Sequence, residues 1–422
     1  MLAEDTSVLY SVASRSSHGG EQMKPDAHTP SRQEWWPFVV SAAALLLIFV
    51  GSGSPTPLFN TYRETTSITD AHLALTTSLY FTTTALSLLL LGRLSDYLGR
   101  RAVSIAAVLL AAGGCLVLTQ VNGPEVLALG RLLQGLSCGM GSTALGAFVV
   151  DTAPPRSSWL AALITGSAPP FAIPIGALFS GAIMRIPDVT PTLTYLIISV
   201  LLLTLAVLLY FCPDTVRPKP GALRSMRPYV RIPAGSGRII FAAGAAFAAT
   251  WSMGGFFQSF SASLTADHLG STDTFVIALV FSAGVLLSPV GGALSGRLRV
   301  ATAVRSGLTV FVLAVMGFIT ALQVGSIVWF LIAAVVAGLG QGAATTGGMR
   351  SVLSSVSAPD RAGVLATMYL ICYSSGAIPS LVVGQLADVV PINVIAIGQG
   401  VLVVIAAVIS MSIVRNYPPR PA

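Results

Sequence analysis

The sequence predicts an all-α polytopic membrane protein, with twelve transmembrane helices arranged as two six-helix halves and both termini in the cytoplasm. Of its 422 residues, 54% are hydrophobic and only 9% are charged, which is too little charge to cover a soluble domain of this length. The apolar residues are grouped in stretches of bilayer length, and landmarks in the first half of the chain recur in the second. These three observations support the fold class.

Each apolar stretch is about 20 residues long, which matches the hydrocarbon core of a bilayer. The twelve stretches begin near Pro37, Leu73, Val103, Glu125, Trp159, Pro191, Ile239, Thr274, Ala303, Ile327, Val364 and Ile392. The predicted units are a disordered cytoplasmic tail (1–36), an N-terminal six-helix bundle (37–212), a cytoplasmic middle loop (213–238), a C-terminal six-helix bundle (239–414) and a second cytoplasmic tail (415–422).

The distribution of basic residues predicts the orientation. Arg63 and Arg185 lie on one set of loops and Arg131 lies inside a helix, while the other twenty Lys and Arg residues lie in the tails, the other loops or near the cytoplasmic helix ends. Positive charge is retained on the cytoplasmic side. The net charge of +7 therefore reports topology, and we expect no nucleic-acid partner.

Cofactor sites are not expected. The four cysteines lie in or at the ends of apolar segments without the spacing of metal ligands, so we predict buried free thiols. The histidines are scattered, and no phosphate-binding loop of the G-x-x-x-x-G-K-(S/T) type is present. We predict no enzyme activity and no cofactor, with a proton gradient as the energy source.

Internal repeats support the two halves. Arg156 and Arg361 are 205 residues apart, and Pro174 and Pro379, each within an Ala-Ile-Pro triplet, are also 205 apart. Two such halves with a substrate site between them are typical of a transporter fold.

The most informative segment lies between the second and third stretches and reads Gly92-Arg-Leu-Ser-Asp96-Tyr-Leu-Gly99-Arg100-Arg101. It resembles the G-x-L-(S/A)-D-x-x-G-R-(R/K) motif of the major facilitator superfamily, which lies in the cytoplasmic loop between helices 2 and 3. The second copy, at 292–299, has Gly296 where the first has Asp96. A charge-based gate is therefore expected mainly on the N-terminal half.

The resemblance implies roles for several of these residues. Asp96, Arg100 and an acid at the cytoplasmic end of helix 4, here Asp151, would form a charge cluster that holds the cytoplasmic side closed. Gly92 and Gly99 would allow helices 2 and 11 to approach and the loop to turn. Arg101 completes the motif. The alternative is a permanent structural staple.

Arg131 lies about six residues, roughly 9 Å, inside helix 4, and Gln134 follows one turn later. This resembles the R-x-x-Q-G motif that the family links to proton coupling. The alternative is an arginine that extends to the outer headgroups, aided by Glu125. Helix 5 departs from the family pattern: its prolines and small residues are out of register with the antiporter motif G-x-x-x-G-P-x-x-G-G, which leaves antiport open.

No Asp or Glu is expected in mid-membrane on helices 1, 2, 5, 7, 8, 10 or 11, so proton coupling would use Asp96, Asp151 or acids near the outer ends. Helix 1 is expected to break at 51–57, where glycine and proline residues gather. Aromatic and amide side chains suit an amphipathic organic substrate. The candidate cavity residues are Trp251, Phe256, Phe257, Gln258, Gln341, Tyr369 and Tyr373.

The favoured function is proton-coupled efflux of a drug-like or amphipathic metabolite. We expect a monomeric antiporter in the cell membrane, and specifically in a bacterial inner membrane. The alternative is uptake or facilitated diffusion of a sugar or organic acid by the same fold, as a symporter or uniporter. The chain reads Pro213-Asp-Thr-Val-Arg217 where sugar porters carry P-E-S-P-R, which disfavours a sugar. A membrane sensor or scaffold would need a soluble domain, and the loops offer none.

Overall fold

Twelve segments are long and apolar enough to cross a membrane. The structure is a computed structural model that describes residues 32–154, 157–228, 230–387 and 389–415. Each segment begins within three residues of the start expected from hydropathy, so the predicted all-helical fold class is confirmed for the described chain.

The N-terminal bundle contains six of these segments. Its elements are α1 (Arg32–Gly53), η1 (Thr56–Leu58), α2 (Phe59–Thr65), α3 (Asp70–Leu91), α4 (Ser95–Leu98), α5 (Arg100–Leu118), α6 (Pro124–Thr152), α7 (Ser158–Ile183) and α8 (Pro191–Tyr210).

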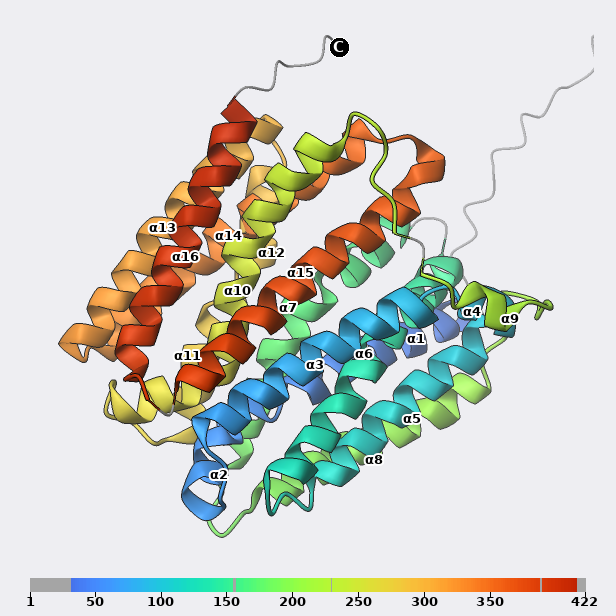
Figure 1. Cartoon of the computed structure of the whole chain (residues 1–422). Helices are drawn as coiled ribbons and strands as arrows, with labels where there is room; N and C mark the ends of the chain where they lie inside the picture. The colour runs from blue at the N-terminus through green and yellow to red at the C-terminus, as the bar shows by residue number, and fades with distance from the viewer. Residues whose placement is uncertain (1–31, 155–156, 229, 388, 416–422) are drawn as a thin grey trace, which may run out of the picture.

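The C-terminal bundle follows a middle segment that carries one short helix, α9 (Ala222–Ser225). Its elements are α10 (Gly237–Asp267), α11 (Thr274–Ala283), α12 (Ser288–Ser295), α13 (Val300–Val324), α14 (Ile327–Ser355), η3 (Ala358–Asp360), α15 (Arg361–Leu386) and α16 (Ile392–Arg415). The two bundles lie side by side, with α3 against α15 and α7 against α11 at their interface (Figure 1).

The membrane helices run alternately between two faces of the molecule. We call the face that bears α4 and the middle segment the motif face, and the face that bears α2 and the loops 66–69, 184–190 and 268–273 the distal face. Each bundle has its own apolar core, and buried phenylalanines such as Phe148 and Phe318 lie at their centres. All four cysteines are buried and free, as the sequence predicts.

The start of α1 corrects one predicted boundary. The tail was expected to extend to residue 36, yet the helix begins at Arg32 and continues through Pro37. Trp35 is partly buried and its ring packs edge-on against Phe38, with centroids 5.7 Å apart. This packing extends the helix to the N-terminal side of the apolar stretch. Residues 1–31 and 416–422 of the predicted tails lie outside the described part of the chain.

The predicted break in helix 1 is confirmed, and it has a structural consequence. The α-helix ends at Gly53, a single 3-10 turn spans Thr56–Leu58, and α2 then continues to the distal face. Near a helix end, main-chain carbonyls lose their intrahelical partners. The carbonyls of Gly51 and Ser52 accept hydrogen bonds from side chains of α6 instead.

Glycines set the closest helix crossings, and they do so at corresponding places in the two bundles. A Cβ on Gly53 or Gly176 would collide with the main chain of the opposite helix where α1 crosses α7. In the C-terminal bundle, a Cβ on Gly255 would collide with Gly376 where α10 meets α15. Gly53 and Gly255 are 202 residues apart, and Gly176 and Gly376 are 200 residues apart. These spacings are close to the 205 residues of the sequence repeat.

Candidate functional site

A cavity of about 450 Å³ lies between the two bundles. Helices α1, α3, α6 and α7 form one wall, and α10, α11, α12, α14 and α15 form the other. The N-terminal bundle contributes Leu45, Phe49, Phe81, Leu88, Ser142, Thr143, Thr165, Gly166, Pro169, Pro170 and Ile173. The C-terminal bundle contributes Phe247, Trp251, Gly254, Gln258, Phe281, Val285, Ser288, Gln341, Thr345, Thr346, Met349, Tyr369, Cys372 and Tyr373. The volume lies in the range of small-molecule sites.

Five of the seven cavity residues proposed from the sequence line this space: Trp251, Gln258, Gln341, Tyr369 and Tyr373. The rings of Trp251 and Tyr373 meet edge-on with centroids 5.1 Å apart. Tyr373 also faces Phe81 of the other bundle, at 6.1 Å between centroids. The aromatic wall therefore joins both halves of the molecule.

Phe256 and Phe257 lie elsewhere, which corrects their assignment to the cavity. Both are buried, and Phe257 packs against Phe318 of α13 and Phe330 of α14, with centroids 5.3 and 5.9 Å away. On α10 the cavity face repeats at the helical spacing of Trp251 and Gln258, seven residues apart. The two phenylalanines project from the other side of α10, into the core of the C-terminal bundle.

Arg131 is fully buried in the N-terminal bundle. Its Nη1 donates to the carbonyl of Ser52, at 2.7 Å, and to Oε1 of Gln134, at 2.9 Å. Gln134 in turn donates from Nε2 to the carbonyl of Gly51, at 2.8 Å. The guanidinium lies 4.2 Å from the ring centroid of Tyr80. An arginine that extends to the headgroups would be exposed at its tip, so that alternative does not describe this side chain.

The charge of Arg131 is stabilised without a carboxylate from the described chain. The carbonyl dipole of Ser52, the amide oxygen of Gln134 and the π face of Tyr80 surround it. Its Nε and Nη2 are buried and find no hydrogen-bond partner among described residues. Such a cation favours any approaching electron-rich group, because an unpaired donor in a dry interior is costly.

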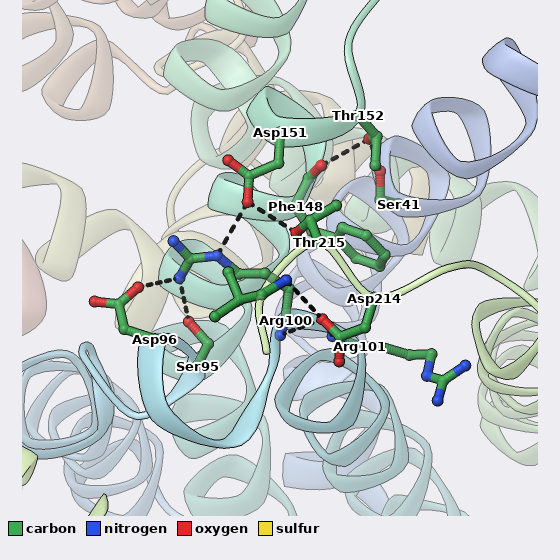
Figure 2. A network of polar contacts seen from close by, with 11 residues as sticks. Ser41, Ser95, Asp96, Arg100, Arg101, Phe148, Asp151, Thr152, Asp214 and Thr215 are labelled. Atoms are coloured by element: carbon green, nitrogen blue, oxygen red, sulfur yellow. Dashed lines mark hydrogen bonds and ion pairs between the residues drawn. The ribbon is translucent and has the colours of Figure 1, made fainter. Parts of the chain in front are cut away.

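The motif residues form a charge cluster at the motif face (Figure 2). Arg100 pairs with Asp96 through Nη1 and with Asp151 through Nε, the latter at 3.2 Å. It also donates to Oγ of Ser95, at 2.7 Å. The three charged side chains predicted to meet are therefore brought together by α4, the start of α5 and the end of α6.

The middle segment completes this cluster, which the sequence reasoning missed. Asp214 accepts hydrogen bonds from the main-chain N–H of Arg100 and of Val216, at 3.0 and 3.2 Å, and Thr215 donates to Asp151 at 2.9 Å (Figure 2). A carboxylate at a helix N-terminus satisfies free N–H groups. The available signal was an acidic residue directly after the sixth apolar stretch.

Gly99 and Arg101 stabilise the turn between α4 and α5. Gly99 has φ +96°, a conformation that other residues rarely adopt, and a Cβ there would collide with the carboxylate of Asp214. Arg101 donates to the carbonyls of Tyr210 and Cys212, each at 3.2 Å.

Gly92 has a different neighbour from the one expected. A Cβ there would face Thr143 of α6, whereas helices α3 and α15 approach closely at Gly384, beside Ala74. The second and eleventh membrane helices, α3 and α15, therefore approach each other near the distal face and not at the motif glycine Gly92. The reason is that the bundles are held together at that face.

Ion pairs join the two bundles at the distal face. Arg63 of α2 pairs with Asp267 of α10 at 3.1 Å, and Arg185 pairs with Asp273 at 2.8 Å. Asp70, which also pairs with Arg63, accepts a short hydrogen bond from Ser263 of α10. The sequence did contain a signal: Arg63 and Arg185 are the two basic residues on the loops where basic residues are otherwise rare.

Comparison with known proteins shows which family has this architecture. The sequence profile described as "Major Facilitator Superfamily" matches residues 41–381, which is most of the chain. The chain belongs to the major facilitator superfamily. It is accordingly a multi-pass membrane protein of a family whose members are generally transporters and not enzymes.

Two named relatives match shorter regions. The uridine/deoxyuridine transporter of Lactococcus lactis subsp. cremoris (strain MG1363) is 34% identical over 96 residues, which are 22% of this chain and 20% of that protein. The human proton myo-inositol cotransporter is 37% identical over 72 residues, 17% of this chain and 11% of that protein. The chain thus matches about a fifth and a tenth of these relatives' lengths.

The fold is similar to solved structures over nearly the whole chain. A bacterial homologue of the human lysosomal transporter Spinster, inward-facing and unoccupied, superposes with a TM-score of 0.71, covering 92% of this chain and 98% of that one at 14% identity. Its inward-facing, occupied form gives 0.69, with 93% and 100% covered at 16% identity. At these identities the likeness shows the fold.

Proposed function

We propose that this protein is a secondary active transporter that moves a small organic molecule by alternating access through the cavity between its bundles. The observation that carries the proposal is the cavity itself, because both bundles contribute its wall. Rocking one bundle against the other would open such a site to one side of the membrane at a time.

The proposed direction is efflux of a drug-like or amphipathic metabolite. Seven of the lining residues carry aromatic rings, and the polar groups of the wall are hydroxyls, two amides and one thiol. A lining of this kind accommodates an amphipathic molecule by dispersion and a few hydrogen bonds. The motif face would be cytoplasmic, in keeping with the basic residues near it. The protein would act as a monomer in the cell membrane, which we propose is a bacterial inner membrane.

Proton coupling is proposed to act through the cluster at the motif face. Among the described residues, the acidic side chains lie at or beyond the ends of the membrane segments. Asp96 and Asp151 both pair with Arg100. Protonation of either carboxylate would remove an attraction from this cluster and favour its rearrangement. Arg131 and Gln134 would link α6 to the broken α1 during that change.

Uptake by the same fold is the second candidate, and a specific observation favours it. The matched relatives carry the names of a uridine/deoxyuridine transporter and a proton myo-inositol cotransporter. In this alternative, proton and substrate would move together, or the substrate would move alone by facilitated diffusion.

The test is a pH-gradient assay in proteoliposomes that contain the wild type or Asp96→Asn. The panel would include lipophilic drugs, organic acids, uridine and myo-inositol, with radiolabel to follow flux. The efflux proposal predicts that a drug-like compound exchanges against protons in the wild type and that Asp96→Asn abolishes this exchange. Co-directional movement of substrate and proton would favour uptake, and flux without proton movement would contradict coupling.

A further inference from the structure

The central cavity has a lining without formal charge. None of the described residues that form its wall is an Asp, Glu, Lys, Arg or His. The buried cation Arg131 lies in the N-terminal bundle and is not part of the wall. A charged ligand would lose its hydration here without gaining a counter-charge, which is strongly unfavourable. The chemistry of the wall therefore favours an uncharged ligand.

One polar group of this wall has unused hydrogen-bonding capacity. Gln258 of α10 is only 4% exposed, and its Nε2 has no hydrogen-bond partner. Gln134 offers a contrast, since both ends of its amide are engaged. Buried polar groups are normally paired, and Gln258 combines an unpaired amide nitrogen with a place on the cavity wall, which Gln399 lacks. The nitrogen is enclosed by protein, so a ligand in the cavity supplies its missing partner only when the Gln258 side chain turns toward it.

The groups around Gln258 define the shape of that partner. Trp251 lies two turns earlier on the same face of α10 and meets Tyr373 edge-on, while Gln341 of α14 lines the same cavity. Aromatic faces bind planar rings. A carboxamide presents one acceptor and one donor side by side. Its complement is a ring edge on which an N–H and a carbonyl are adjacent, as in a lactam or a cyclic imide.

We infer that the cavity binds an uncharged planar molecule with a lactam or imide edge, which the Gln258 carboxamide recognises while Trp251 and Tyr373 contact the ring. Gln341 supplies a second amide from α14. This inference rests on the proposed transport function and narrows its substrate class. Gln258 is then a specificity-determining residue of the central site.

The test measures equilibrium binding to the purified full-length protein in nanodiscs. The probes are radiolabelled uridine, which carries an imide edge, and 3-methyluridine, in which a methyl group replaces the imide hydrogen. Gln258→Leu removes the amide, and Gln258→Glu removes the donor at nearly constant shape. The matched control is Gln399→Leu, because Gln399 is also 4% exposed with an unpartnered Nε2 but does not line the cavity.

The inference predicts that the wild type binds uridine at least tenfold more tightly than 3-methyluridine. Both Gln258 variants should lose that preference, while Gln399→Leu keeps it and all variants elute as folded, monodisperse protein. The wild-type comparison of the two probes needs no variant, so a misfolded mutant does not remove the test. Equal binding of both probes, no binding of either, or full affinity in folded Gln258→Leu would overturn the inference.

The flux panel separates this inference from the transport proposal. Movement of an organic acid or a cationic drug, unaffected by Gln258→Leu, would overturn the uncharged substrate class and leave transport intact. Absence of flux for every compound in the panel would overturn the proposed transport.

Discussion

At the scale of single residues, the most unusual group is Arg131, a buried cation whose partners are carbonyls and a ring. The break in α1 frees the carbonyls of Gly51 and Ser52, and Arg131 and Gln134 of α6 bind them. The same glycines and prolines that interrupt the helix thus create the binding groups for the arginine.

Arg131→Ala is expected to destabilise the N-terminal bundle. It would leave the carbonyl of Ser52 and Oε1 of Gln134 unpaired, and an unpaired buried acceptor costs about 1–3 kcal/mol. A thermal-unfolding measurement in detergent should show a lowered Tm. Arg131→Lys keeps one donor and the charge, and should lie between the wild type and Arg131→Ala. An unchanged Tm for Arg131→Ala would contradict the structural role.

Gly99→Ala should destabilise the turn before α5. The strained backbone conformation costs about 1–3 kcal/mol for a residue other than glycine, and the added methyl would displace Asp214 from the N-terminus of α5. Hydrogen exchange of the first turn of α5 should become faster. Gly113→Ala, in the middle of the same helix with no atom within 4 Å of the added Cβ, should leave that exchange unchanged.

At the scale of elements, α7 combines three internal prolines with a close crossing of α1. Pro169, Pro170 and Pro174 lie inside the helix, where each lacks the main-chain donor of other residues. Gly176 lies two residues after Pro174 and contacts α1.

Gly176→Val should prevent the close packing of α7 on α1. The valine side chain would occupy the position of the Val50 main chain, and no rotamer change can move a backbone that is already packed. We expect little folded protein by size-exclusion chromatography after extraction. Gly113→Val, which points into open space, is the control. A monodisperse Gly176→Val protein with wild-type yield would contradict the crossing.

At the scale of the whole molecule, two polar assemblies occupy opposite faces. The cluster of Asp96, Arg100 and Asp151 lies within one bundle, whereas the pairs of Arg63 and Arg185 join both. Hydrogen bonds from Ser78 to the carbonyl of Ala377 and from Ser282 to that of Pro174 also cross the interface. The described structure is thus held closed toward the distal face.

Charge reversal should open this face. Arg185→Glu would set two carboxylates against each other in place of the pair with Asp273. Pulsed EPR between spin labels at Asp188→Cys and Thr272→Cys, on distal loops of the two bundles, should show a longer mean distance. The double variant Arg185→Glu/Asp273→Arg should restore the wild-type distance. Exposed pairs are individually weak, so the shift is expected to be a change in populations.

The same pair should be insensitive to pH near neutrality. The hydrogen bond from Arg185 holds the pKa of Asp273 below its ordinary value, aided by the N–H groups of Val276 and Phe275. In an open state the carboxyl would lose Arg185 and keep the N–H groups of its own helix, so its pKa would rise toward the ordinary value of about 3.9. The contribution to closure is therefore complete above about pH 4 and lost as pH falls through the lowered pKa. The EPR distance should not change between about pH 5 and 8.

The sequence predicted the helices because hydropathy is a local signal, and the resemblance to the family motif implied the cluster that includes Asp151. Hydropathy marks each span, and Asp96 and Arg100 are four residues apart. Contacts between bundles depend on how distant segments dock, so Asp267 and Asp273 gave no local sign of their partners. Phe256 and Phe257 were misplaced for a related reason: composition marks α10 as aromatic, and only its rotation about the helix axis decides which rings face the cavity.

The central claim is that transport requires the two bundles to separate at the distal face. The most direct test joins Arg185→Cys to Asp273→Cys with a flexible bis-methanethiosulfonate reagent and measures substrate flux in proteoliposomes. The account predicts that cross-linking blocks flux, that a reductant restores it, and that neither single-cysteine variant responds. Undiminished flux through fully cross-linked protein would contradict alternating access between these bundles.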